Sequence, residues 1–480
     1  MIDTTIFVSL FLFGIGLMIN MPRAWAFIRS VRGRARWAAL AWALMFVALG
    51  VFFGREDNVL GIGSMDRSAW FQVVCIGLAG AILLVLAFDQ RVIANLWRLP
   101  IVLLATYGAL GIFSAAYSPA PAISAYKGSL ILMDSLLVAA SIAAFGRSGD
   151  AKAVLNLSYF LATLFAAGAL VGAVLDPTTA FGPSEGVLGV ILYGTYPHMN
   201  PNTLGFLGAI ISIVAFNRFT QKGSFATRFY WASQLGVGLL VLFLSQARTS
   251  LLSFIICFFF MSLSIPGKRW IASLAGLVIM VAVAYSAITG SLPNNWSGEL
   301  LETAAQYAER GQRNSGLQTL KDRASVWFTA GIDMIRDRPL LGHGYDTGVR
   351  YGAQKYGLAN THMHNAHFQV LANSGVLGYS IWSLMVASVG YPVIRRLMRD
   401  HWPARTEDDR FFLEMFAVLL VVLLRTVTGQ VLVAHLWSLM LFLGMVVYLY
   451  LERRNATAEP RSRTTQAARG QVTGIRARTT

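Results

Sequence analysis

The chain has 480 residues, of which 56% are hydrophobic and 13% are charged. That charged share is about half the share in a soluble domain, so the composition excludes an ordinary soluble protein. The formal net charge of +16 does not indicate nucleic-acid binding, because the basic residues are spread over short gaps between apolar runs and do not form one basic face. We therefore predict an integral membrane protein and expect no nucleic-acid partner.

Apolar runs long enough to cross a bilayer recur along the chain. A hydrocarbon core about 30 Å thick needs about 20 helical residues, and helices satisfy every backbone polar group within one segment. The first run lacks a basic leading region and a small-residue cleavage site, so we interpret it as a retained helix and not as a signal peptide. We predict an all-α polytopic protein with about 12 or 13 transmembrane helices. Their expected ranges are 4–20, 37–53, 70–88, 99–117, 127–146, 153–175, 203–216, 230–246, 250–266, 270–290, 376–394, 411–428 and 432–451.

The distribution of Lys and Arg predicts the orientation of these helices. The gap 21–36 is rich in arginine, and later gaps on the same side, such as 395–405, are also basic. The gap 176–202, on the other side, has no Lys or Arg. Because basic loops remain in the cytoplasm, this alternation predicts an external N-terminus and a cytoplasmic C-terminus. The basic tail 453–480 is expected to be a disordered cytoplasmic extension.

The longest hydrophilic segment, residues 291–375, falls on the external side. We expect one helix at 297–311, which begins with a Ser cap and early glutamates, and another at 317–337, which ends before a proline. A third, short helix is expected from His364 to Gly375. The predicted organisation is transmembrane helices 1–10 in residues 1–290, an external helical loop domain in 291–375, transmembrane helices 11–13 in 376–452 and the tail in 453–480.

The densest polar cluster is residues 361–367, which contain His362, His364 and His367. Imidazole has an unperturbed pKa near neutrality, so one of these histidines is a candidate general base. Interfacial histidines that only make hydrogen bonds are the simpler alternative. A metal site is disfavoured, because the spacing matches no standard zinc pattern and no H-E-x-x-H motif is present.

Three arginines are expected at the external membrane face. Arg248 lies between two spans with almost no loop, and an arginine at that depth is costly unless it is paired or faces a polar cavity. Arg323 shares a helix face with Trp327, and Arg425 ends the twelfth span. Guanidinium groups around one cavity would bind phosphate or pyrophosphate oxygens bidentately. The alternative for each is contact with lipid headgroups or solvent.

Two smaller features also have two interpretations. The amides of Asn200 and Asn202 suit sugar hydroxyls, although an Asn-Pro sequence also favours a simple turn. Glu56 and Asp57 could hold a divalent cation, although an exposed acidic turn is the better explanation.

Several segments together resemble the O-antigen ligase family. His364-Asn365, followed by nine residues, Gly375, two residues and Gly378, reproduces its H-N-x9-G-x-x-G pattern. Four more segments resemble its R-x3-W, R-P-L-x-G-x-G-aromatic, S-x-x-R-T/S and N-P-N motifs: 323–327 (RASVW), 338–345 (RPLLGHGY), 245–249 (SQART) and 200–202 (NPN). The matches lie in the family's order, whereas the first 190 residues resemble it only as a run of spans.

The resemblance implies a GT-C-type glycosyltransferase of the bacterial inner membrane, with its active site facing the periplasm. Such enzymes transfer a glycan from undecaprenyl pyrophosphate to an acceptor hydroxyl, without metal, nucleotide or other cofactor. Transfer by direct attack opposite the pyrophosphate inverts the anomeric configuration. By position, the resemblance assigns the catalytic base to His364 and pyrophosphate binding to Arg248 and Arg323. Further candidate substrate-binding residues are Asn365, Arg338, Asn200, Asn202 and Arg425.

The acceptor is left open by the sequence. An O-antigen ligase would use lipid A–core, and a polymerase of O-antigen or exopolysaccharide would use a growing polysaccharide with the same donor. A transporter is a third interpretation, for which Asp134 is the clearest mid-span ionisable residue, but we find no internal repeat. A metal-dependent transferase using Glu56 and Asp57 is a fourth. The expected external N-terminus departs from the family, whose members usually have both ends inside. The lack of a large soluble domain after the last span argues against the family's protein-glycosylating branch.

Overall fold

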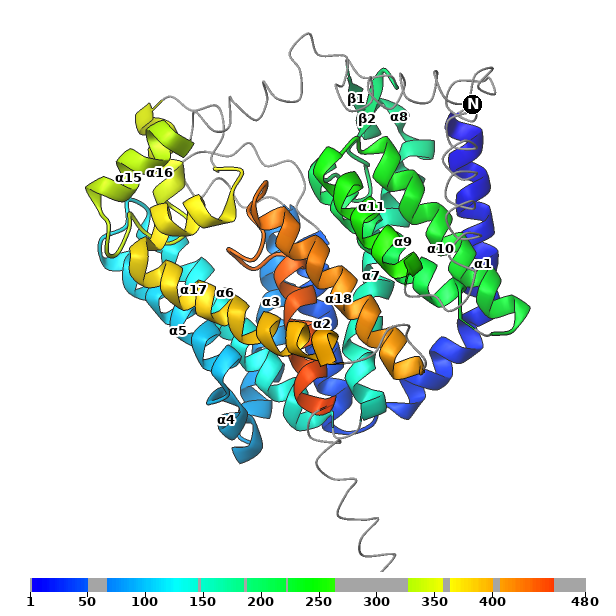
Figure 1. Ribbon diagram of the computed structural model, residues 1–480, viewed down its shortest axis with the longest axis horizontal. Helices are drawn as coiled ribbons and strands as arrows, with labels where there is room; N and C mark the ends of the chain where they lie inside the picture. The colour runs from blue at the N-terminus through cyan, green and yellow to red at the C-terminus, as the bar shows by residue number, and fades with distance from the viewer. Residues whose placement is uncertain are drawn as a thin grey trace, which may run out of the picture.

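A computed structural model describes residues 2–50, 67–145, 148–184, 188–221, 223–263, 327–356, 363–399 and 406–452. Several sequence predictions lie outside these described residues: the span 270–290, the helix 297–311, most of the helix 317–337, the tail 453–480, Arg323, His362, Glu56 and Asp57. The described part is almost entirely helical (Figure 1).

Helices follow one another with short connections. They are α1 (Ile2–Ser30), α2 (Arg34–Gly50), α3 (Arg67–Ala87), α4 (Gln90–Leu96), α5 (Leu99–Phe113), the 3-10 turn η1 (Ser114–Ala116), α6 (Pro121–Ala144), α7 (Ser148–Leu175), α8 (Pro177–Ala180), α9 (Pro201–Phe219), α10 (Phe225–Leu244), α11 (Arg248–Leu263), the π-helical turn η2 (Trp327–Gly331), α15 (Ile332–Asp337), α16 (Gly348–Tyr356), α17 (Ala366–Arg399), α18 (Glu407–Thr426) and a C-terminal helix (Trp437–Glu452). Two strands, β1 (Phe181–Pro183) and β2 (Val190–Leu192), form an antiparallel hairpin in which Phe181 pairs with Leu192.

Among the described residues, seven helices are long and apolar enough to cross a membrane, and three shorter apolar helices accompany them. The prediction of an all-α polytopic membrane protein is confirmed. The helices differ in their depth within the bundle. In α9, 78% of the membrane-length stretch is buried inside the protein, whereas the figure for α3 is 28%. The first is therefore a central helix, and the second exposes most of its side chains to lipid.

Local sequence explains where two central helices begin. Asn200 caps α9 by accepting a hydrogen bond from the backbone N–H of Asn202 at 2.9 Å, and the next residue is a proline, which needs no partner for a missing N–H in the first turn. Thr406 and Asp409 form a capping box at the start of α18. The acidic first turn of α18 and Arg425 in its last turn both complement the helix dipole.

Small residues bring neighbouring helices close together. A Cβ atom on Gly208 of α9 would lie 2.7 Å from the carbonyl oxygen of Gly238 in α10. A Cβ atom on Gly128 of α6 would lie 2.6 Å from the backbone nitrogen of Ile112 in α5. Close backbone packing of this kind holds membrane helices together, because lipid provides no hydrophobic driving force between them.

The helices run alternately between two ends of the bundle. One end, which we call the site end, contains the β1–β2 hairpin, the start of α9 and the last turns of α10 and α18; the N-terminus also lies there, uppermost in Figure 1. The opposite end contains the starts of α7, α10 and α18 and the end of α17. The basic segments 218–228 and 395–399 lie at this opposite end.

Three features refine the sequence prediction. The last helix begins at Trp437 and not at residue 432, because residues 427–436 form an irregular connection. The hairpin and α16 are additions, since segments this short give little periodic signal. The expected short helix up to Gly375 is present as the first part of α17, which bends at this glycine, where φ is 61° and ψ is −168°.

Candidate functional site

The end of α18 joins two segments that carry sequence motifs. Arg425, in its last turn, is 9% exposed, and its Nη1 donates to the carbonyl oxygen of Asn202 and to Ser250 Oγ, the latter at 2.9 Å. Its guanidinium also lies over the ring of Phe206, 5.2 Å from the centroid. Arg425 therefore fastens the N-P-N turn to the first turn of α11, which begins at Arg248.

Arg248 is half-buried at the first residue of α11. The turn before it is held by Gln246, which has a positive φ of 48°. Gln246 Nε2 donates to the carbonyl oxygen of Val190 in β2 at 2.6 Å, and its Oε1 accepts from Ser184 Oγ at 3.2 Å. The hairpin thus fixes the approach to α11. An arginine at a helix start lies beside unpaired backbone N–H groups, an arrangement that suits an anion.

His364 lies in the turn before α17 and is half-buried. Its φ of 51° is uncommon for a residue other than glycine, asparagine or aspartate. Both neighbours of this histidine are fixed by long-range or local bonds. The backbone N–H of Met363 donates to Gln369 Oε1 at 3.4 Å, and Asn365 Nδ2 donates to the carbonyl oxygen of Val427 at 3.1 Å. Backbone strain of this kind concentrates at functional sites.

Asn365 links this turn to α18. Its Oδ1 accepts from the backbone N–H groups of His367 and Phe368 at 2.9 and 3.2 Å, which caps α17, while its Nδ2 reaches Val427 just beyond the end of α18. The two motif segments are therefore both bonded to one short stretch, residues 425–427. This stretch brings the segments of Arg248 and His364 together.

His367 has a packing role instead. Its ring meets Trp382 edge-on with centroids 5.3 Å apart. Its Nδ1 lies 3.1 Å from the hydroxyl of Tyr379, and its Nε2 lies 3.4 Å from Thr426 Oγ1. Both ring nitrogens face side chains of the fold, so among the described residues of the cluster His364 is the better candidate for a base.

Residues 338–345 pack along the bend of α17. The backbone N–H of His343 donates to the carbonyl oxygen of Ala372 at 3.0 Å, and its Nε2 lies 2.9 Å from the carbonyl oxygen of Met334. Burial lowers the pKa of His343, so the neutral imidazole can carry its proton on Nε2 and donate it to that carbonyl. The conformation of the R-P-L-x-G-x-G-aromatic segment is therefore structural in origin.

Tyr345, the aromatic residue of that segment, connects it to the membrane helices. Its backbone N–H donates to Ser114 Oγ at 2.9 Å, and its hydroxyl donates to the carbonyl oxygen of Val433 at 2.7 Å. Its ring packs edge-on against Tyr107, with centroids 5.4 Å apart. The start of α17 is thus held from two sides.

Not every predicted site residue is brought to this place. Arg338 is exposed at the end of α15 and makes no hydrogen bond or ion pair with the described residues. In Figure 1, α15 lies across the bundle from α9 and α11, so Arg338 is far from Arg248. Asn200 spends its side-chain oxygen on the cap of α9, and the side chain of Asn202 is exposed.

Replacing Gly375 with alanine is expected to lower both stability and activity. Its φ and ψ belong to a region that is essentially restricted to glycine, and a Cβ atom would lie 2.3 Å from the carbonyl carbon of Leu340. We expect a loss of about 1–3 kcal/mol, measured by thermal unfolding, together with reduced transfer. Gly390→Ala in the same helix is the matched control, because no atom lies within 4 Å of its new Cβ. Equal effects of the two changes would contradict this role of Gly375.

One buried pair was not expected from the sequence. His435 Nδ1 lies 2.9 Å from Asp134 Oδ2 and 3.0 Å from Oδ1, and both side chains are buried. Asp134, the mid-span residue of the transporter interpretation, thus has a partner from the irregular connection 427–436. The available signal was that two lone ionisable residues in apolar runs each require a partner.

Residues 235–383 match the family model described as O-antigen ligase. The match runs from α10 into α17 and includes Arg248, His364 and Asn365, as well as Arg323 outside the described residues. No curated protein gives a significant match. The match confirms the resemblance seen in the motifs. Through residues 235–383, this multi-pass membrane protein belongs to the O-antigen ligase and polymerase superfamily.

Proposed function

We propose that the protein is an O-antigen ligase, which transfers a glycan from undecaprenyl pyrophosphate to a sugar hydroxyl of lipid A–core. The observation that carries this proposal is the pair of contacts at the end of α18, Arg425 with Ser250 and Val427 with Asn365. These contacts join a segment with an anion-binding arginine to a segment with a candidate base. Transfer from a pyrophosphate needs both groups near one another.

In the proposed reaction, His364 takes the proton of the acceptor hydroxyl as the hydroxyl oxygen bonds to the anomeric carbon. The bond from that carbon to the pyrophosphate oxygen breaks on the opposite face, so the configuration inverts and undecaprenyl pyrophosphate leaves with the electron pair. Arg248 and Arg323 stabilise the negative charge on the leaving oxygen, in place of a metal ion. Asn365 and Arg425 act as positioning residues for His364 and Arg248.

We place the site end in the periplasm of a bacterial inner membrane. The gathering of basic segments at the opposite end supports this orientation, because basic loops remain in the cytoplasm. The donor's long lipid would then lie in the outer leaflet beside α9, α11 and α18. Residues 291–375 would form the periplasmic loop domain that covers the acceptor.

Metal independence can be tested with the purified protein in lipid nanodiscs. With lipid-linked glycan and lipid A–core, we expect product to form at the same rate, within about twofold, in the presence and absence of EDTA, since arginines replace the metal ion. Boiled protein and omission of acceptor are the controls. Loss of activity in EDTA that Mg²⁺ or Mn²⁺ restores would favour the metal-dependent alternative at Glu56 and Asp57.

The superfamily match also supports a polymerase with the same donor chemistry. Deletion of the gene separates the two activities. Loss of a ligase leaves polymer on the carrier lipid and unmodified lipid A–core, whereas loss of a polymerase leaves single repeat units. Single repeat units in the deletion strain would overturn the ligase assignment and leave the half-reaction at His364 intact.

A further inference from the structure

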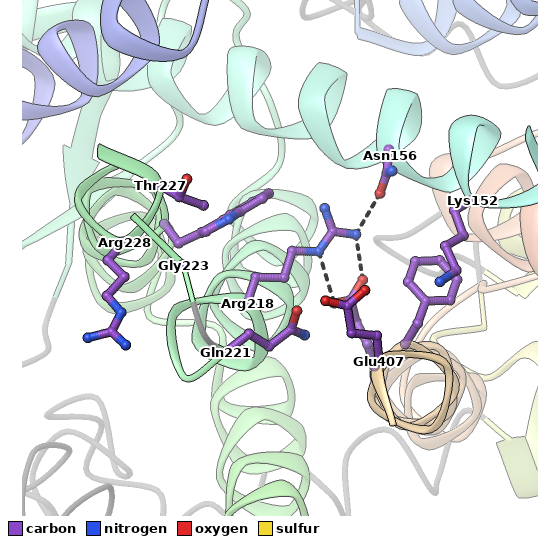
Figure 2. A pocket seen from close by; sticks show the side chains of 11 residues that line it. Lys152, Asn156, Arg218, Gln221, Gly223, Thr227, Arg228 and Glu407 are labelled. Atoms are coloured by element: carbon purple, nitrogen blue, oxygen red, sulfur yellow. Dashed lines mark hydrogen bonds and ion pairs between the residues drawn. The ribbon is translucent and has the colours of Figure 1, made fainter. Parts of the chain in front are cut away.

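A second polar pocket lies at the opposite end of the bundle, between α7, α9, α10 and α18 (Figure 2). Its volume is about 220 Å³. Helix α9 begins at Pro201 beside the candidate site and reaches Arg218 of this pocket near its last residue. Its 19 residues span roughly 28 Å, so the pocket is separate from the candidate site.

The floor of the pocket is a buried ion pair. Arg218 Nη2 lies 2.7 Å from Glu414 Oε1, and Arg218 Nε lies 3.0 Å from Oε2, so the pairing is bidentate. Nη2 also donates to Asn156 Oδ1 at 2.6 Å, and the guanidinium lies over the ring of Trp231, 4.8 Å from its centroid. Figure 2 shows these bonds as dashed lines. Because the charges of the pair cancel and its bonds are made within the protein, it shapes the pocket without demanding a ligand.

Other groups in the lining are not used by the protein. The side chains of Arg228 and Glu407 are exposed, and neither makes a hydrogen bond or ion pair with any residue that the structure describes. Within the same part of the chain, the amide of Gln221 and the indole N–H of Trp231 also lack a partner. The pocket therefore offers one positive charge, one negative charge and two neutral donors to a ligand.

The surroundings indicate a bilayer headgroup. Helix α10 begins beside the pocket with Phe225, which is 83% exposed and stacks on Phe229 with centroids 6.2 Å apart. Tyr230 and Trp231 follow, with centroids 4.9 Å apart. Aromatic side chains at the end of a membrane helix lie at the level of the headgroups. Basic pockets between membrane helices on the cytoplasmic side bind phosphate headgroups.

We propose that this pocket binds the headgroup of a zwitterionic phospholipid, with the phosphate at Arg228 and Gln221 and the ammonium group of phosphoethanolamine at Glu407. An acidic headgroup such as phosphoglycerol satisfies Arg228 but brings its charge near the carboxylate of Glu407, which disfavours it. The cavity of about 220 Å³ has room for roughly seven waters at about 30 Å³ each, which suits a group of this size. Bound there, the lipid would join the inner ends of α9, α10 and α18.

Native mass spectrometry of the full-length protein tests this proposal with phosphatidylethanolamine and phosphatidylglycerol as probes. We expect the wild type to retain the first phosphatidylethanolamine at least about fivefold more strongly than phosphatidylglycerol. Arg228→Gln is expected to weaken binding of both lipids about tenfold. Glu407→Gln is expected to remove the preference and keep the binding. Arg395→Gln, an exposed arginine at the end of α17 on the same side of the bundle, is the matched control and should change neither lipid.

Thermal unfolding separates binding from folding. We expect Arg228→Gln to melt like the wild type in delipidated detergent and to lose the stabilisation that added phosphatidylethanolamine gives. Equal losses with Arg228→Gln and Arg395→Gln would overturn the site. Equal retention of both lipids by the wild type would overturn the zwitterionic assignment. Displacement of the lipid by inorganic phosphate at millimolar concentration would assign the pocket to a soluble phosphate and overturn the lipid.

Discussion

His364→Asn is expected to lower the rate of glycan transfer by about 10²–10⁴-fold, because a positioned general base contributes that much to such a step. Asparagine tolerates the positive φ of 51° at this position, so the turn before α17 should keep its shape. Its amide cannot take up a proton at neutral pH. The measurement is the turnover rate of the purified protein with lipid-linked glycan and a saturating acceptor.

The pH profile provides the control for this prediction. The wild-type rate should fall on the acidic side as the base becomes protonated, with a midpoint in the range of an imidazole, about 6–7. The residual rate of His364→Asn should lack that ionisation, while its melting temperature stays close to that of the wild type. A variant that keeps at least about a third of the rate and the same profile would refute the assignment.

Loss of either member of the Asp134–His435 pair is expected to destabilise the protein by roughly 3–5 kcal/mol. The two side chains are 0% and 5% exposed, so water cannot replace a missing partner. Asp134→Ala leaves the imidazole without its acceptor, and His435→Ala leaves a buried carboxyl group without its donor. Unfolding of each variant in nanodiscs, followed by tryptophan fluorescence, gives the free-energy change.

A double variant shows whether the two residues act as a pair. Asp134→Leu combined with His435→Leu replaces both polar groups with apolar ones and should recover most of the lost stability. Because His435 lies in the connection 427–436, the single variants should also reduce transfer by loosening Val427 from Asn365. Free-energy losses that simply add in the double variant would show that the pair is not coupled.

The long helices could be predicted because a membrane span needs about 20 apolar residues, a signal that composition carries. The predicted ranges 203–216 and 230–246 overlap the observed α9 and α10 for this reason. Their ends were placed less well, since caps and interfacial residues are not apolar. The connection 427–436 was missed because an irregular backbone that is buried within protein keeps apolar side chains.

The candidate site was predictable only in its residue types and spacing. His364 and Arg248 stand out as a histidine and an arginine in segments that resemble family motifs. Their supporting contacts do not, because Arg425 meets Ser250 across 175 positions and Asn365 meets Val427 across 62. Such pairings depend on how each helix is rotated in the bundle, which is not a local property of the sequence. Arg323 lies outside the described residues, and its role stays a prediction.

The contacts at residues 425–427 also have a consequence for biosynthesis. They join segments around Ser250 and Asn365 that leave the ribosome earlier than α18 does. Because a nascent chain emerges and folds from its N-terminus, the histidine and arginine segments enter the membrane before anything holds them together. A chain whose translation stops before α18 would therefore be inert. The cell would thus be protected from partly made copies that could release glycans from the carrier lipid.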